Sequence, residues 1–298
     1  MKRLLVLALW LLALPAQAAL EVFATGPEWA ALAKEIGGER VNAWSATHGL
    51  QDVHRIEARP SLIARARRAD LVIATGAELE VGWLPVVLRE SGNAAIQPGK
   101  TGYFEAAAHV RMLDVPKTVD RIHGDVHAAG NPHFVADARV YLKIGEALAS
   151  RLSTLDAANA GAYQAGYRAF AGKWRAALAR WEAQAKPLRG VPVAVQHDAF
   201  VYLEDWLGLK RVATLEPKPG VEPGAAYLQE VLARLAAQPA RMVLRPAYQH
   251  DASSRWIAER SKLPVVTLPL TVGGTAEAKD LYTLFDDTLA RLLAALNP

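Results

Sequence analysis

The stretch from Asp156 to Lys186 constrains the fold of this chain more than any other part. Apolar residues recur along it at steps of three and four, which places them on one stripe of an α-helix. The stripe consists of Tyr163, Tyr167, Phe170, Trp174, Ala177 or Leu178, and Trp181. About thirty helical residues at 1.5 Å each span roughly 45 Å, which exceeds the width of a small domain. The stretch therefore predicts a rigid spine between two bodies, with an ordinary core helix inside one large domain as the alternative.

Short β-branched runs alternate with helical patterns on both sides of this spine. Such alternation is typical of mainly parallel sheets with helices packed against them. Strands are expected at 20–24, 40–44 and 71–74 before the spine, and at 191–196, 212–215, 241–244 and 265–268 after it. Residues 91–120 show turn chemistry and no regular element. The predicted fold class is α/β, with an N-terminal lobe at 19–155, the linking helix at 156–186 and a C-terminal lobe at 187–298.

The first eighteen residues have the pattern of a secretory signal peptide. Lys2 and Arg3 precede the apolar run Leu4–Leu14, and Ala16-Gln17-Ala18 is a small-x-small cleavage site. The run is too short to cross a membrane as a helix. We expect a mature chain that begins near Ala19 and is exported to the periplasm of a Gram-negative cell.

The charge of the chain and its lack of cysteine limit which partners it can bind and which side chains can hold a metal. Removal of residues 1–18 takes the basic count from 34 to 32 against 30 acidic residues, and the net charge from +4 to +2. The basic residues are scattered, which argues against nucleic acid as a partner. The chain has no cysteine, so a metal site must use His, Asp, Glu or water. A monomer is expected.

Histidines follow the predicted strands in both halves of the chain. His54 and a glycine-bearing loop with His123, His127 and His133 belong to the first lobe, and His197 follows a strand of the second. In open α/β sheets, ligands bind beyond the carboxyl ends of the strands. Imidazole is the most usual ligand for zinc and related ions. The pattern therefore predicts a transition-metal site in the cleft between the lobes.

Three segments resemble the periplasmic zinc and manganese receptors of metal ABC transporters. The segment QDVHRIEARPSLIARARRADLVIATGAELEVGWL is similar to the first metal-ligand region of that family, GNPHFVADARVYLKIGEALASRL to the second, and VPVAVQHDAFVYLEDWLGLK to the third. Their order and spacing hold along essentially the whole mature chain. The resemblance implies that His54, His133 and His197 bind the metal. It also implies delivery of the ion to an ABC transporter permease in the inner membrane.

The chain departs from the family pattern at the fourth ligand. The family supplies an aspartate in a late strand-to-loop turn, which here reads Val265–Leu270 and has no carboxylate. His127 is the first candidate to replace it, because Gly124 and Gly130 allow its loop to fold back. Glu216, Asp251 and Asp280 are weaker candidates, and a water molecule is the alternative to a fourth protein ligand.

Three functions stay open at this stage. The first is a non-catalytic receptor for a divalent transition ion, and its histidines favour Zn²⁺ over Mn²⁺, which usually needs several carboxylate oxygens. The second is a periplasmic zinc hydrolase with water in the fourth position, although HExxH and GxSxG motifs are missing. The third is a receptor for a chelated metal or another small solute. His48 and His109 are expected on the surface, and His250 is expected to form a surface pair with Asp251.

Overall fold

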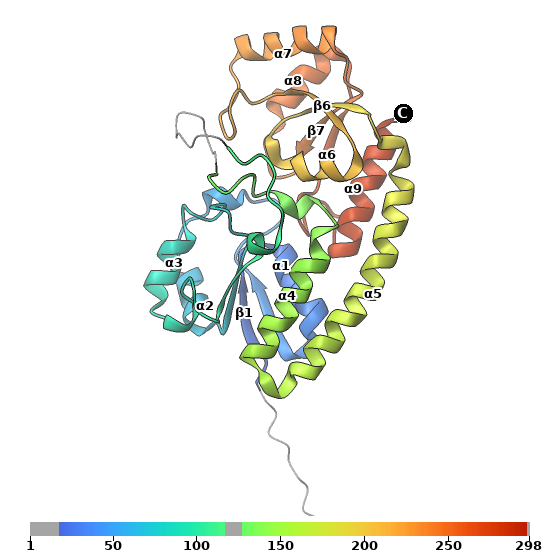
Figure 1. Ribbon diagram of the computed structural model, residues 1–298. Helices are drawn as coiled ribbons and strands as arrows, with labels where there is room; N and C mark the ends of the chain where they lie inside the picture. Colours follow the sequence, from blue (N-terminus) through green and yellow to red (C-terminus); the bar gives the residue numbers. More distant parts are fainter. Residues whose placement is uncertain (1–17, 117–126, 297–298) are drawn as a thin grey trace, which may run out of the picture.

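The computed structural model of the chain describes residues 18–116 and 127–296, and its strands form two separate parallel sheets (Figure 1). In the N-terminal lobe the order is β2 (Val41–Ser45), β1 (Leu20–Ala24), β3 (Leu71–Ala74) and β4 (Tyr103–Glu105). In the C-terminal lobe it is β6 (Lys210–Thr214), β5 (Pro192–Val195), β7 (Met242–Pro246) and β8 (Val265–Leu268). Each sheet thus repeats one topology, which confirms the two predicted α/β lobes. Residues 1–17, which hold nearly all of the expected signal peptide, lie outside the described residues.

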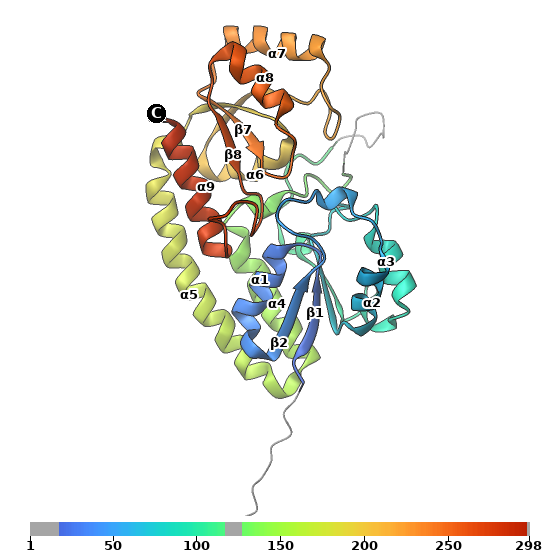
Figure 2. The same ribbon diagram turned by 180° about the vertical axis from the view of Figure 1, so that it is seen from behind.

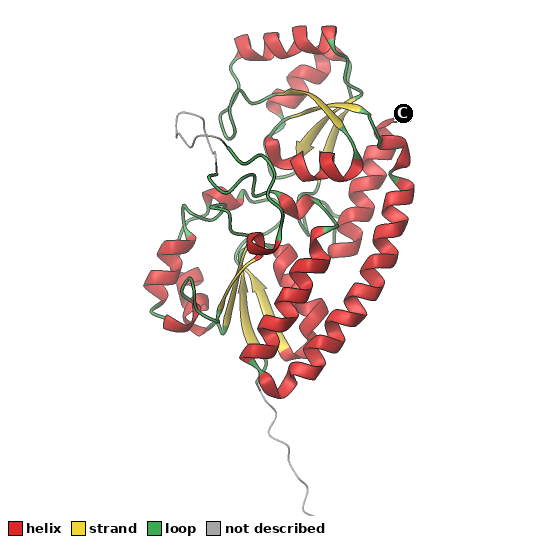
Figure 3. Ribbon diagram, in the orientation of Figure 1, coloured by secondary structure: helices red, strands yellow, loops and turns green. Residues whose placement is uncertain are grey.

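Helices cover the sheets of both lobes (Figure 3). They are α1 (Pro27–Gly37), α2 (Pro60–Arg68), α3 (Leu84–Ser91) and α4 (Val140–Leu155) before the spine, and α6 (Val201–Leu207), α7 (Ala225–Ala237), α8 (Ala252–Ser261) and α9 (Leu281–Leu296) after it. Proline stands in the first turn of α1, α2 and α3, where a missing N–H costs nothing. Gly92 and Gly208, with φ of 66° and 72°, end α3 and α6 in the left-handed region.

The spine helix α5 (Ala160–Gln184) is shorter than predicted. Asp156 accepts a hydrogen bond from Asn159 N and caps a separate 3-10 turn, Ala157–Asn159. A second 3-10 turn, Lys186–Leu188, follows its other end. Both views show α5 running along one side of the two lobes with α9 beside it (Figures 1 and 2).

The apolar stripe of α5 is the place where the lobes share their core. Trp174 has no exposed surface, and its ring centroid lies 5.2 Å from that of Tyr141 in α4 and 5.7 Å from that of Phe285 in α9. Its Nε1 donates to Ala138 O at 2.8 Å. One continuous cluster of buried side chains extends from the first sheet through these helices to the second. The long helix is therefore a spine between the lobes, as its spacing predicted.

The sequence reasoning was wrong at β4, because residues 91–120 were expected to be irregular. Tyr103 and Glu105 pair in parallel register with Val72 and Ala74 of β3. A three-residue strand at a sheet edge has too little alternation to be told from a turn by pattern. No helix among residues 18–116 and 127–296 is long and apolar enough to cross a membrane. The lobe boundaries at 155 and 187 stay a prediction.

Candidate metal centre

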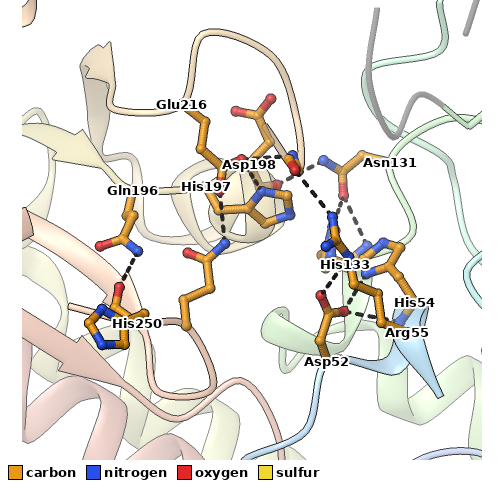
Figure 4. Close-up of polar contacts among 12 residues, drawn as sticks. Asp52, His54, Arg55, Asn131, His133, Gln196, His197, Asp198, Glu216 and His250 are labelled. Carbon is orange, nitrogen blue, oxygen red and sulfur yellow. Dashed lines mark hydrogen bonds and ion pairs between the residues drawn. The ribbon is translucent and has the colours of Figure 1, made fainter. Parts of the chain in front are cut away.

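Four histidines come together between the sheets, and Figure 4 shows three of them, His54, His133 and His197. The fourth, His127, has its ring beside that of His54, and the loops that follow the strands gather in the same region (Figure 3). His54 lies in a 3-10 turn that follows β2. His133 stands directly before the turn that leads to α4, and His197 follows β5. His127 joins them from the loop that precedes His133. The site thus draws on both lobes, because the carboxyl ends of the two sheets face the same space.

The spacing of the four rings suits a shared ion. Centroid separations are 5.3 Å for His54–His133, 5.4 Å for His54–His127, 5.2 Å for His133–His197 and 6.4 Å for His54–His197. Imidazoles bound to one tetrahedral zinc at about 2.0–2.1 Å place their centroids roughly 5 Å apart. Among the described residues, however, no three donors already stand close enough together to hold an ion. Two of these pairs join the lobes, and His54–His197 at 6.4 Å is the wider of them, compared with 5.2 Å for His133–His197.

Carboxylates hold one ring nitrogen of His54 and of His197. His54 Nδ1 lies 2.7 Å from Asp52 Oδ1, and His197 Nδ1 lies 2.7 Å from Glu216 Oε2 (Figure 4). A carboxylate only accepts hydrogen bonds, so Nδ1 carries the proton and Nε2 keeps its lone pair. Partners of this kind orient metal-binding imidazoles and raise their basicity.

Asn131 does the same for His133 with a neutral amide. Its Oδ1 lies 2.9 Å from His133 Nδ1 and accepts from His133 N at 2.9 Å. The Nε2 atoms of His54, His133 and His197 are buried without a hydrogen-bond partner, and that of His127 is buried as well. A buried nitrogen left without a partner costs about 1–3 kcal/mol. A metal ion bound here would supply the partner that the lone pairs of His54, His133 and His197 lack.

The environment of the cluster shifts the pKa values of His133 and His197 in opposite directions. Burial, followed by the neighbouring imidazoles, lowers the pKa of His133 well below its ordinary value. Burial alone opposes charge on His197, but the hydrogen bond and the charge of Glu216 outweigh it and raise that pKa. Burial acts to raise the pKa of Asp52, but the hydrogen bond from His54 outweighs burial, so the pKa is lowered. His133 therefore stays neutral, while the carboxylates of Asp52 and Glu216 lie next to His54 and His197.

The weaker candidates for a fourth ligand lie elsewhere or act differently. Glu216 is the hydrogen-bond partner of His197. Asp251 is half-buried, and its carboxylate lies 3.5 Å from Arg255 Nη2. Asp280 is exposed and caps α9 by accepting from Thr283 N at 2.7 Å. Of the candidates named from the sequence, His127 alone is brought to the other three histidines.

The remaining histidines stay outside the cluster. His48 is exposed, and His250 is exposed with its Nδ1 3.9 Å from the neighbouring aspartate, as predicted. His109 is half-buried rather than on the surface, because its ring stacks on Phe104 at 5.1 Å. His123 lies outside the described residues.

Sequence reasoning missed three polar residues of the site. Asp52 and Asn131 each stand two positions before a clustered histidine, a spacing that could have indicated them. Glu28 in α1 gave no such signal, because an acidic residue in a first turn is ordinary. It is nevertheless buried and accepts a hydrogen bond from Thr271 Oγ1 of the other lobe. Burial raises the pKa of Glu28 to about 7.

Comparison with known proteins places this site in a family. The sequence matches the family described as zinc-uptake complex component A, periplasmic, over residues 22–295. The chain belongs to this family. It is 24% identical over 253 residues to the high-affinity zinc uptake system protein ZnuA of Yersinia pestis, covering 78% of this chain and 77% of the relative.

Solved structures show the same fold. The protein FpvC of Pseudomonas aeruginosa in complex with Mn²⁺ superposes with a TM-score of 0.79 at 24% identity, over 93% of this chain and 98% of that one. A zinc-bound ZnuA with residues 138–173 deleted superposes with a TM-score of 0.78 at 20% identity, over 94% and 99% of the chains. FpvC is also known with Ni²⁺. Members of this fold thus hold different divalent ions.

Proposed function

We propose that the chain is the extracytoplasmic receptor that binds one Zn²⁺ between its lobes and delivers it to an ABC importer. The observation that supports this most directly is the buried, unpartnered Nε2 of His54, His133 and His197, each with its Nδ1 already held by an acceptor. Three aligned lone pairs from two lobes suit a divalent ion better than a larger solute. Mn²⁺ fits less well, because it favours carboxylate oxygens.

His127 in the fourth position supports a receptor over an enzyme. Catalytic zinc sites keep three protein ligands and one place for water, whereas closed sites use four. His127, His133 and His197 line one cavity of about 110 Å³, which supports the proposal that the imidazole of His127, rather than a catalytic water, is the fourth ligand. We therefore propose that the chain is no hydrolase.

The remaining parts of the proposal concern the cell rather than the site. Residues 1–18 act as a cleaved signal, the mature chain begins near Ala19, and the protein works as a periplasmic monomer. Its partner is the permease of the transporter, and nucleic acid is no partner. N-terminal sequencing of exported protein tests the first statement, since an intact Met1 would overturn it.

Metal analysis of the purified mature protein, before and after chelation, tests the function. We expect one Zn²⁺ per chain, removable and restorable, and preferred over Mn²⁺ in competition. Failure to take up Zn²⁺ after chelation would overturn the proposal. Measured turnover on ester or peptide substrates, lost with the metal, would support the hydrolase instead.

A further inference from the structure

The side-chain amide of Asn131 connects the two lobes beside the metal centre. On one side its Oδ1 accepts from His133 N at 2.9 Å and faces His133 Nδ1 at 2.9 Å. On the other side its Nδ2 donates to Asp198 O at 2.8 Å. Asp198 follows His197 directly, so one amide group touches the supports of two histidines from different lobes (Figure 4).

Hydrogen bonds also fix the backbone of Asn131. Asn131 N donates to Leu113 O at 2.8 Å, and Asn131 O accepts from Tyr202 Oη of helix α6 at 2.8 Å. The same hydroxyl accepts from Leu113 N at 2.9 Å. Gly130 makes this approach possible, because a Cβ on it would lie 2.7 Å from Leu113 O and its φ is +109°. The amide therefore has little freedom to swing away from either lobe.

An amide is the group that this position needs, because it donates and accepts at once. An aspartate has nearly the same shape but only accepts hydrogen bonds. It would keep the contact with the N–H groups of His133 and would turn an oxygen toward the carbonyl of Asp198. An asparagine and an aspartate at residue 131 thus differ at the contact with Asp198 O, where only the asparagine can donate. Both can accept the hydrogen bonds from His133.

We propose that Asn131 is a positioning residue that couples His133 to the C-terminal lobe and thereby sets the rate of metal release. The proposal rests on the metal-binding function proposed above. The Nδ2–Asp198 O bond is formed in this structure, at the contact between the lobes beside His133 and His197. Separation of the lobes breaks this bond and frees the support of His133, so opening and loss of a ligand occur together.

The test compares Asn131→Asp with Asn131→Ala in the full mature chain. Zn²⁺ release is timed by capture with a chelator, and Co²⁺ is used as a second probe because its visible absorption reports ligand number and geometry. For Asn131→Asp we expect the wild-type Co²⁺ spectrum and release about tenfold faster, the equivalent of one lost hydrogen bond. For Asn131→Ala we expect an altered spectrum and still faster release.

Asn42→Asp is the matched control. Asn42 is exposed on β2 and donates its amide to Glu21 Oε1 at 2.8 Å within one lobe, so the same substitution removes a comparable bond without touching the cleft. Its release rate should equal that of the wild type. Wild-type release from Asn131→Asp, or a spectrum altered as much as in Asn131→Ala, would overturn the coupling.

Tyr202→Phe covers the case in which Asn131→Asp does not fold. It removes the other bond from the C-terminal lobe to Asn131 and leaves the amide in place, so release should quicken with an unchanged Co²⁺ spectrum. An unchanged rate would again overturn the coupling. If the wild type itself binds neither Zn²⁺ nor Co²⁺, the metal-binding function fails rather than the role of Asn131.

Discussion

Glu216 Oε2 lies 2.7 Å from His197 Nδ1 and also accepts a hydrogen bond from Gly220 N at 2.8 Å. The carboxylate that orients the imidazole therefore also holds the proline-rich loop around Gly220. In turn, Gly220 O accepts from Arg55 Nη2 at 3.2 Å, and Arg55 follows His54. The loop thus links the histidine of one lobe to the turn that carries a histidine of the other.

Replacing Glu216 with glutamine should weaken Zn²⁺ binding by about 10–100-fold, because such partners of a ligating imidazole contribute that much. The change removes the negative charge behind His197 and keeps the size of the side chain. Competition with a chromophoric chelator measures the affinity. Glu222→Gln, at an exposed position of the same loop, is the control and should bind as the wild type does. Equal affinities for both variants would show that Glu216 has no part in binding.

The four histidines should differ in a way that identifies the fourth ligand. Alanine at 54, 133 or 197 removes an imidazole that is aligned by an acceptor, so Zn²⁺ affinity should fall severely in each case. His127→Ala should weaken affinity by at least about tenfold if its ring binds the ion. A silent His127→Ala would assign the fourth place to water. A silent His54→Ala or His197→Ala would contradict a site between the lobes.

Zn²⁺ affinity should fall as the pH drops from 7.5 to 5.5, since protons compete for imidazoles with ordinary pKa values of about 6.5. The pKa of His197 is raised and that of His133 is lowered, so His197 takes up a proton at a higher pH than His133 does. Calorimetry in buffers of different ionisation enthalpy should therefore show proton release on binding near neutral pH. Equal affinity at both pH values would count against a shell of histidines.

Trp174→Ala should lower the free energy of unfolding by roughly 3–5 kcal/mol, because the ring is fully buried where both lobes meet α5. Denaturant unfolding of the metal-free protein measures it. Trp256→Ala, at a half-buried site on α8, should lower the free energy of unfolding by less. A thermal midpoint that Trp174→Ala leaves unchanged would remove the case for a structural spine.

Glu28 should make stability depend on pH. Its pKa is about 7 in the folded protein, above the ordinary value of 4.5, so its contribution to the free energy of unfolding is complete below about pH 4.5 and is lost as the pH rises from there through 7. Glu28→Gln should remove up to about 3 kcal/mol of this dependence. Denaturant unfolding at about pH 4.5 and pH 8 tests it, with the exposed Glu35→Gln on the same helix as the control. If the free energy of unfolding changed with pH in the same way for the wild type and Glu28→Gln, Glu28 would not be a source of the pH dependence.

Much of this architecture follows from local patterns. The stripe around Trp174 predicted the spine, because steps of three and four are a property of the helix alone. Alternation of strands and helices predicted two parallel sheets, and the order of the strands along the chain then placed His54 and His197 at their carboxyl ends. Short-range geometry was sufficient for each of these inferences.

Tertiary structure alone decided how the site is completed. Glu216 meets His197 across 19 positions of sequence, and Asn131 meets Asp198 across 67. The loop of His127 folds onto the other rings, while Asp251 and Asp280 turn to the surface. These outcomes depend on how the two lobes pack against one helix and a shared core, and no local periodicity encodes that relative placement. Which ring nitrogen faces the metal follows from the same packing, because it is set by the partner that holds the other nitrogen.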